Sequence, residues 1–176
     1  MATKETENWT FHHLGLIVHD LEKTVAYFKS LGIVEFPPPL PKPTSTGPVW
    51  KEMMAFGEIL LKDGKPTTPR NPDAKPGGLQ FCRLETITYE IIQPTKNSGI
   101  REFNGDFLEK NGEGISHIAY GVAPEHFDEE VEKMLAKGIE IVQSGKQMEN
   151  RGQYAYFDTR EGGGIATELM EVRSRS

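Results

Sequence analysis

The sequence predicts an α+β fold in which two βαβββ modules follow one another and their curled sheets form a half-open cavity similar to a β-barrel. Three repeated features predict it: an apolar run with a histidine near its start, a helical segment that ends in Gly-Ile, and a closing strand with a central glutamate. The two copies lie at residues 11–18 and 114–122, at 32–33 and 138–139, and at 88–92 and 166–170. This duplication indicates two similar halves that face each other.

The composition is typical of a soluble globular protein, with 36% hydrophobic and 26% charged residues in a chain of 176. A chain of this length can bury a core as one large domain or as two tightly packed halves. The net charge of -6 argues against a nucleic acid partner, because there is no basic stripe to neutralise phosphates. The sequence has no apolar run of about 18 residues and no signal-like segment, so we expect a cytoplasmic protein without a membrane partner.

The chain has one cysteine, Cys82, which excludes an intrachain disulfide and indicates a reducing compartment. Cys82 lies in an apolar run that is typical of a strand. A buried, unreactive thiol is therefore favoured over a nucleophile.

The first half begins with a strand and a capped helix. Residues 1–9 are polar and we expect them to be frayed, whereas residues 11–18 are typical of a largely buried strand. Asp20 is a suitable N-cap, and Gly32 is a suitable C-terminal stop for the helix between them. The apolar face of this helix is expected to consist of Leu21, Val25, Phe28 and Leu31.

A short strand is expected at residues 33–36, and the composition then changes from residue 37 to residue 78. This region contains ten of the twelve prolines, which excludes a long regular element. A loop of this length inside a compact domain is usually functional or disordered. Residues 49–56 within it are apolar enough to pack against another surface. We interpret residues 37–78 as an insertion that forms either a lid over the site or a contact in a homodimer.

The remaining elements divide the chain into two modules and a linker. The first module, residues 10–95, is completed by two strands at residues 79–84 and 87–93. The linker, residues 96–114, contains an amphipathic helix around residues 100–110.

The second module, residues 115–173, repeats the order of elements with shorter loops. After its first strand we expect a helix at residues 127–138 and strands at 139–143, 153–158 and 165–172. The loop at residues 160–164 contains three glycines, which allow positive φ angles. The tail beyond residue 173 is expected to be disordered.

The repeated histidines and glutamates predict a metal site. His13 and His117 hold equivalent positions in the first strands, and Glu90 and Glu168 hold equivalent positions in the last strands. If a pseudo-twofold axis relates the modules, all of them converge near that axis. Two imidazoles and two carboxylates suit a borderline divalent ion such as Zn, Ni, Co, Mn or Fe.

The alternative is that these histidines are ordinary strand residues and that the glutamates are solvated or paired. A carboxylate in the middle of an apolar strand, as at Glu168, is costly unless it is paired or bound to a metal. The matched pairs therefore favour the metal. His12, His19 and His126 have no counterpart in the repeat, so we expect them on the surface, with His12 facing away from His13.

A longer motif connects these positions to a known family. It consists of Tyr-Glu-Ile-Ile-Gln-Pro at residues 89–94, Ser98, Phe-Leu-Glu-Lys at 107–110 and Gly-Glu-Gly-Ile-Ser-His-Ile-Ala at 112–119. In these residues the chain resembles the vicinal oxygen chelate (glyoxalase/bleomycin-resistance) superfamily, which includes glyoxalase I, extradiol dioxygenases and methylmalonyl-CoA epimerase. The resemblance covers residues 10–173, is strongest to methylmalonyl-CoA epimerase-like proteins, and implies a glyoxalase-like fold. It also implies metal ligands at His13, Glu90, His117 and Glu168.

The resemblance implies a metal-dependent epimerase or isomerase that removes a proton next to the carbonyl group of a small-molecule or acyl-CoA substrate. Glu168 or Glu90 would act as the base, and Gln80 could position a substrate oxygen. Gln80 occupies the position where some epimerases carry a glutamate that acts as a separate acid or base. Glutamine cannot take a proton, so Glu52, in the insertion, is an alternative base. The insertion is much longer than the usual loop of that family.

Other functions within the same superfamily stay open. One is a glyoxalase I-like lyase or another enzyme of the superfamily, and another is a non-catalytic protein that binds a small molecule, as antibiotic-binding relatives do. An oxygenase is less favoured, because sites with two histidines and one carboxylate leave a fourth position free that is filled here. Related proteins often dimerise, so we expect a homodimer.

Overall fold

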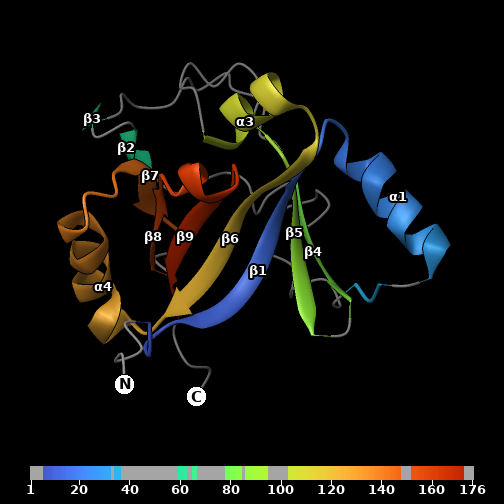
Figure 1. The fold of residues 1–176 in the computed structure, drawn as a ribbon. Helices are drawn as coiled ribbons and strands as arrows, with labels where there is room; N and C mark the ends of the chain where they lie inside the picture. The colour runs from blue at the N-terminus through green and yellow to red at the C-terminus, as the bar shows by residue number, and fades with distance from the viewer. Residues whose placement is uncertain are drawn as a thin grey trace, which may run out of the picture.

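The computed structural model describes residues 6–32, 34–36, 59–62, 65–66, 78–84, 86–94, 103–147 and 152–172. Within these residues the strands form one nine-stranded mixed sheet in the order β3-β2-β7-β8-β9-β6-β1-β5-β4 (Figure 1). The end strands β3 and β4 do not pair with each other, so the sheet stays open. The predicted α+β fold with an open, glyoxalase-like sheet is confirmed.

Both halves of the chain contribute to this sheet. From the first half come β1, α1, β4 and β5, at Thr10–Ile17, Leu21–Leu31, Gly78–Leu84 and Ile87–Gln93. From the second half come β6, α4, β7, β8 and β9, at Gly114–Val122, Pro124–Ala136, Ile141–Lys146, Gln153–Phe157 and Ala166–Glu171. Helix α3, Phe103–Asn111, lies between them in the sequence, and a short 3-10 helix at Arg160–Gly162 joins β8 to β9.

Strands β1 and β6 run antiparallel through the middle of the sheet (Figure 1). Strand β5 pairs in parallel with β1, and β9 pairs in parallel with β6. The register is symmetrical, because His13 pairs with Ala119 and Gly15 pairs with His117. The two histidines are 104 positions apart, and Gly15 and Ala119 have the same separation. A pseudo-twofold relation between the halves therefore passes through this strand pair.

Helix α1 forms as the sequence predicts. Asp20 accepts a hydrogen bond from the backbone N–H of Lys23 at 2.9 Å, and Gly32 ends the helix in the left-handed region with φ 64°.

The apolar face of α1 packs against β4 and β5 in a cluster that contains Leu21, Val25, Phe28, Cys82 and Ile91. Burial raises the pKa of the Cys82 thiol to about 11, so this thiol is protonated and inaccessible, as predicted. Leu31, expected on the apolar face, is exposed.

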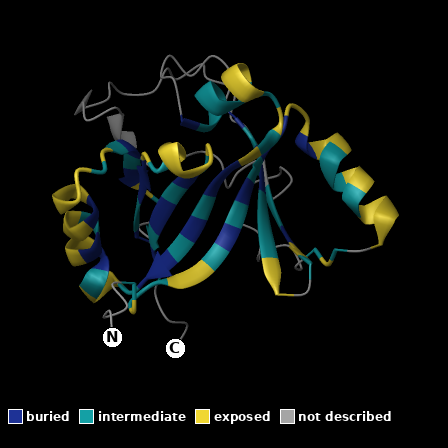
Figure 2. Cartoon of the chain, viewed as in Figure 1, coloured by how far each residue is buried: buried dark blue, intermediate teal, exposed yellow. Residues whose placement is uncertain are grey.

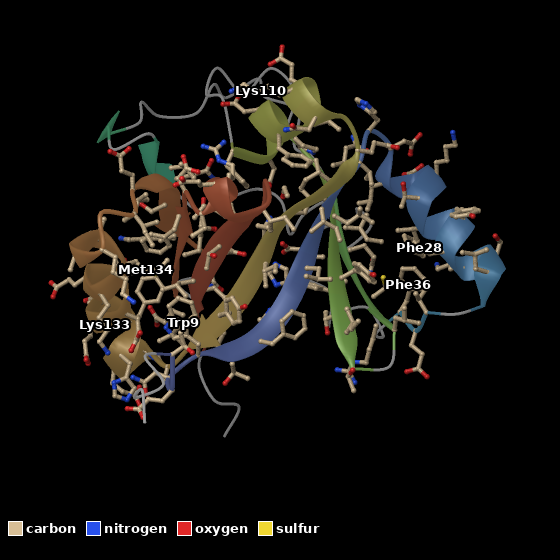
Figure 3. All side chains as sticks on the ribbon, viewed as in Figure 1. Trp9, Phe28, Phe36, Lys110, Lys133 and Met134 are labelled. Atoms are coloured by element: carbon tan, nitrogen blue, oxygen red, sulfur yellow. The ribbon has the colours of Figure 1, made fainter. Side chains whose placement is uncertain are left out.

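The segment just before β1 is anchored against α4, although we expected it to be frayed. The indole N–H of Trp9 donates to Glu130 Oε2 at 2.7 Å, and the amide of Asn8 donates to Glu130 Oε1 at 2.9 Å. Lys133 Nζ lies 2.9 Å from the same Oε1 atom. Figure 3 shows Trp9 and Lys133 side by side next to α4. The prediction of fraying is therefore wrong for Asn8 and Trp9, because a buried carboxylate in the second half binds them.

Part of the proline-rich insertion joins the sheet. It contains β2, Ile59–Lys62, and β3, Lys65–Pro66. Strand β2 pairs antiparallel with β7, so a segment of the first half extends the sheet of the second half. The apolar residues 49–56, proposed above as part of a lid or dimer contact, lie outside the described residues.

A short strand was expected at residues 33–36. Of these, the described residues 34–36 form an isolated bridge, between Glu35 and Arg83 on β4, rather than a longer ladder. Proline 37 follows directly and has no N–H with which to continue a ladder. In the second half β7 begins later than expected, at Ile141, after Gly138 turns the chain with φ 79°.

The apolar core occupies both faces of the sheet: the clusters beneath α1 and α4 lie on the outer face, and Phe107 and Leu108 of α3 pack on Ile17 and Ile92 on the other. Figure 2 shows buried residues along the central strands and exposed residues on the outer sides of α1 and α4. The cluster beneath α4 is the larger one and includes Val122, Phe127, Met134, Ala155, Phe157 and Leu169. Among the residues described, no helix combines the length and apolar character needed to cross a membrane.

We predict that Glu130→Ala lowers the free energy of unfolding by about 2 kcal/mol or more, because it leaves the N–H groups of Asn8 and Trp9 without their buried acceptor. Glu129→Ala is the matched control: Glu129 contacts the same Lys133 at 2.8 Å but is 59% exposed, so its loss should change stability by at most about 0.5 kcal/mol. Urea denaturation of both variants tests this, and equal effects would contradict the proposed anchor.

Candidate metal centre

Four neighbouring strands bring two histidines and two glutamates together at the centre of the sheet. They are His13 on β1, Glu90 on β5, His117 on β6 and Glu168 on β9. One ligand atom from each lies within 4.8 Å of the other three. The structure thus places side by side all four residues that the repeat marked as candidate ligands.

The donor atoms of this cluster have the spacing of a coordination shell. His13 Nε2 lies 3.0 Å from Glu90 Oε2 and 3.4 Å from Glu168 Oε2. His117 Nε2 lies 3.4 Å from Glu168 Oε2 and 3.8 Å from Glu90 Oε2. The two Nε2 atoms are 3.2 Å apart. Ligands bound about 2.0–2.2 Å from one zinc-like ion lie about 3–3.6 Å from each other, so these atoms can surround such an ion.

Without a cation, the burial of these polar side chains costs free energy. His13, His117 and Glu168 are all less than 5% exposed. Glu168 Oε2 is the one buried side-chain nitrogen or oxygen among the described residues that has no hydrogen-bond partner. An ionised carboxylate oxygen left in this condition costs several kcal/mol. A divalent ion among the four donors would supply the missing interaction, so the residues fit a metal.

The pKa shifts of His13 and Glu90 also indicate a place for positive charge. Burial lowers the pKa of His13, but the charge of Glu90 and the contacts with both carboxylates outweigh it and raise the pKa to about 10. Burial raises the pKa of Glu90, but the charge of His13 and the contacts with both histidines outweigh it and hold the pKa well below its usual range. The site therefore favours positive charge at its centre, which either a proton or a metal ion can provide.

Gly15 is needed for the position of His117. A Cβ atom built on Gly15 would lie 1.8 Å from His117 Cε1 and 2.2 Å from Nε2. The imidazole therefore lies directly over the backbone of β1, and any side chain at position 15 would displace it. The sequence analysis placed Gly15 in the strand but missed this role.

Aromatic rings enclose the two histidines. Phe81 on β4 lies 5.7 Å from the His13 ring, and Tyr156 on β8 lies 5.0 Å from the His117 ring, measured between centroids. Phe103, at the start of α3, stacks on Tyr156 at 4.9 Å. Burial and the charges of the two glutamates hold the pKa of Tyr156 well above its usual value, so its hydroxyl is neutral. The sequence pattern did not indicate these residues; Tyr156 shares the face of Glu168 because the two are partners in the pairing of β8 with β9.

Gln80 does not join the cluster. It pairs with Ile91, whereas its neighbour Phe81 pairs with Glu90 and shares the face of the candidate ligands. Ile91 is fully buried in the cluster beneath α1, so Gln80 lies on the opposite face of the sheet from Glu90. Its amide donates to the carbonyl of Phe81 at 2.9 Å. The suggested role of Gln80 in positioning a substrate oxygen is therefore not retained, and Glu52 lies outside the described residues.

The other histidines fall into two groups. His19 is exposed, and His126 lies at the surface with its side chain 43% exposed, as predicted. His12 was expected to face away from His13, but its Nδ1 atom lies 2.8 Å from His13 Nδ1. The alternation is broken by an irregularity between Phe11 and His13 in the pairing of β1 with β6.

The open sheet has a central antiparallel pair with parallel outer neighbours, and its convergent His-Glu-His-Glu set could hold a metal ion between two similar halves. The family model of the Glyoxalase/Bleomycin resistance protein/Dioxygenase superfamily matches residues 12–157. The chain belongs to this superfamily. No curated protein sequence matches it.

Solved structures with the same fold include several epimerases. A hypothetical protein from Bacillus halodurans C-125 has a TM-score of 0.60 at 16% identity, covering 97% of this chain and 99% of that one. Methylmalonyl-CoA epimerase from Mycobacterium tuberculosis has a TM-score of 0.60 at 15% identity, covering 98% and 93%. Methylmalonyl-CoA epimerase from Streptomyces coelicolor, in complex with 2-nitronate-propionyl-CoA, has a TM-score of 0.58 at 18% identity, covering 94% and 95%. At these identities the similarity establishes the fold.

We predict that Gly15→Ala weakens divalent metal binding by about tenfold or more, because the new methyl group must displace the His117 ring from the cluster. Gly114→Ala, also in a strand of this sheet, is the control, since its Cβ would meet nothing closer than 3.9 Å. Competition with a chromophoric chelator measures both affinities. Wild-type affinity in Gly15→Ala would show that the His117 ring does not contribute to binding.

Proposed function

We propose that this protein is a divalent-metal-dependent epimerase or isomerase that removes and returns a proton next to the carbonyl group of an acyl-CoA or related substrate. The observation that carries the proposal is the buried Glu168 Oε2 atom, which has no hydrogen-bond partner and faces three other metal-type donors. His13, Glu90, His117 and Glu168 would hold the ion. Once bound, a divalent ion at this place polarises a chelated carbonyl oxygen and stabilises the charge that develops there.

The two carboxylates suit proton transfer on both faces of a carbon acid. Glu90 and Glu168 belong to opposite halves and pair with equivalent strands, since Glu90 is level with Gly15 and Glu168 with Ala119. An epimerase needs one group to take the proton and another to return it on the opposite face. A lyase of the glyoxalase kind can use a single side. The twofold arrangement of the carboxylates therefore favours epimerisation.

Glu90 is the better candidate for the first proton transfer. Its side chain is 12% exposed, against 6% for Glu168, so a substrate has more access to it. In this proposal the oxygen of Glu90 that does not hold the ion takes the proton from the α-carbon. Glu168, protonated from solvent beforehand on its own free oxygen, returns a proton on the other face, and exchange with solvent resets both carboxyl groups. The neutral Tyr156 and the ring of Phe81 exclude water from the two histidines, which strengthens these electrostatic interactions.

The structural similarity to methylmalonyl-CoA epimerases adds support for an acyl-CoA substrate. One of these structures holds 2-nitronate-propionyl-CoA, and another holds methylmalonyl-CoA. A glyoxalase I-like lyase and a non-catalytic binding protein are the competing functions, and they predict different outcomes in the experiment below.

We predict that the protein loaded with Co2+ or Zn2+ catalyses exchange of the α-hydrogen of methylmalonyl-CoA with deuterium from D2O. His117→Ala should abolish this exchange because it removes a proposed metal ligand, and Glu90→Gln should slow it by about a hundredfold or more because it removes the proposed base. Mass spectrometry of the recovered thioester measures the incorporated deuterium.

His126→Ala, which changes an exposed histidine on α4, is the control and should exchange at the wild-type rate. Conversion of the hemithioacetal of methylglyoxal and glutathione, without exchange of the thioester, would indicate a lyase instead. Tight binding of an acyl-CoA with neither activity would indicate a binding protein.

A further inference from the structure

The strand pair at the centre of the site contains two matched β-bulges. In β1, Phe11 pairs with Tyr120 and His13 pairs with Ala119, so His12 is an extra residue without a partner on β6. In β6 the corresponding irregularity lies between the partners of Gly15 and Leu16, which are His117 and Ile115, so Ser116 is the extra residue. The separation between the two bulged residues equals that between the two histidines, 104 positions. The repeat therefore extends beyond the four candidate ligands to the residue that precedes each histidine.

Each bulged residue contacts the same atom of the histidine that follows it. His12 Nδ1 lies 2.8 Å from His13 Nδ1, and Ser116 Oγ lies 2.7 Å from His117 Nδ1. In both cases the Nε2 atom on the other side of the ring points to the centre of the cluster. A regular strand would direct residue 12 or 116 to the opposite face, whereas a bulge re-aims it. The bulges thus bring a hydrogen-bonding group to the outer nitrogen of each imidazole.

The hydrogen bonds around His117 determine where its proton lies. The hydroxyl of Ser116 donates to Asn104 Oδ1, on α3, at 3.2 Å. The one hydroxyl proton is then used, so the Ser116 oxygen must accept at its contact with His117, and the Nδ1 atom of His117 must donate. The Asn104 side chain also forms a hydrogen bond with Tyr156. In this neutral tautomer the Nε2 atom of His117 carries a lone pair and no hydrogen.

The same reasoning applies to His13. Two Nδ1 atoms at 2.8 Å can form a hydrogen bond only if one of them is protonated. The Nε2 atoms of His13 and His117 make four close contacts with the carboxylate oxygens of the cluster, so they are the ring nitrogens that would bind a metal ion there. A nitrogen bound to a metal ion carries no proton, so in the metal-loaded site Nδ1 of His13 is the donor and His12 is the acceptor.

We infer that His12 and Ser116 are positioning residues that hold the Nε2 lone pairs of His13 and His117 toward a bound metal ion. This inference rests on the metal site of the proposed function and extends that site to two residues that touch neither metal nor substrate. Hydrogen bonds to the outer nitrogen fix the tautomer and the orientation of a metal-binding histidine, and their loss typically costs about tenfold to a hundredfold in metal affinity.

The direct test is the tautomer of the two histidines in the Zn2+-loaded, full-length protein. A long-range 1H–15N correlation spectrum of the 15N-labelled protein identifies which ring nitrogen carries hydrogen. We expect a hydrogen on Nδ1 of both His13 and His117 and none on their Nε2 atoms. Hydrogen on Nε2 of either ring in the loaded protein would overturn the inference.

Affinity measurements separate a positioning role from a merely structural one. His12→Phe keeps a ring but removes the acceptor, and it should weaken Zn2+ binding by about tenfold to a hundredfold. His12→Asn offers an amide oxygen near the position of Nδ1 and should recover most of that loss. Equal affinity in the Phe and Asn variants would overturn the role of His12.

Ser116→Ala removes the hydroxyl without adding bulk, and should weaken Zn2+ binding by a similar factor and release the Nδ1 hydrogen of His117 to faster solvent exchange. Thr159→Val, which removes a hydroxyl that donates to the carbonyl of Ile165 at 3.0 Å, is the control and should bind Zn2+ normally.

If the wild-type protein binds Zn2+ and both Ser116→Ala and His12→Phe bind it equally well, the inference is wrong and the proposed function stands. If the wild-type protein binds no divalent metal, both are wrong.

Discussion

The antiparallel pairing of β1 with β6 is the constraint on which the site depends. It places His13 opposite Ala119 and His117 opposite Gly15, so each imidazole faces a residue small enough to leave room for it. The parallel strands on either side then carry one glutamate each to the same level. Because side chains alternate along a strand, a slip of one residue between β1 and β6 would turn a histidine away from the others. The geometry of the whole cluster is thus determined by one strand pair.

The apolar clusters beneath α1 and α4 and the polar residues of the candidate metal centre lie on opposite faces of the sheet. Helices α1 and α4 bury apolar clusters on the outer face, while the inner face carries two imidazoles and two carboxylates among aromatic rings. Glu168 Oε2 makes no hydrogen bond in that environment. A carboxylate kept in this condition destabilises a protein unless a cation compensates it. The outer clusters explain how the chain folds with such a site, and the four donors could hold an ion that compensates its buried charge.

The sequence was sufficient to find the four candidate ligands because the repeat marks equivalent positions, and equivalent positions meet when a twofold relation joins the halves. It did not exclude Gln80, which the family resemblance placed at the site: the pairing of β4 with β5 makes Phe81, and not Gln80, the partner of Glu90. The contacts of His12 with His13 could not be found in this way, because a bulge depends on the register between strands. The hydrogen bond from Trp9 to Glu130 joins residues 121 positions apart, so no local sequence pattern predicts it.

The four candidate ligands are arranged symmetrically, but the groups that contact the two histidines from outside the cluster differ. Two carboxylates from equivalent strands can serve two faces of one substrate carbon equally, which is what an epimerase requires. The outer nitrogens of the histidines are held differently, by a partly exposed imidazole at His12 and by a fully buried hydroxyl at Ser116 that is bound to α3 through Asn104. A movement of α3 would therefore act on His117 through a chain of hydrogen bonds, whereas its contact with β1 and β5 is the apolar packing of Phe107 and Leu108 on Ile17 and Ile92. The duplicated frame provides the four candidate ligands, and the linker helix is hydrogen-bonded through Asn104 and Ser116 to one of the two histidines.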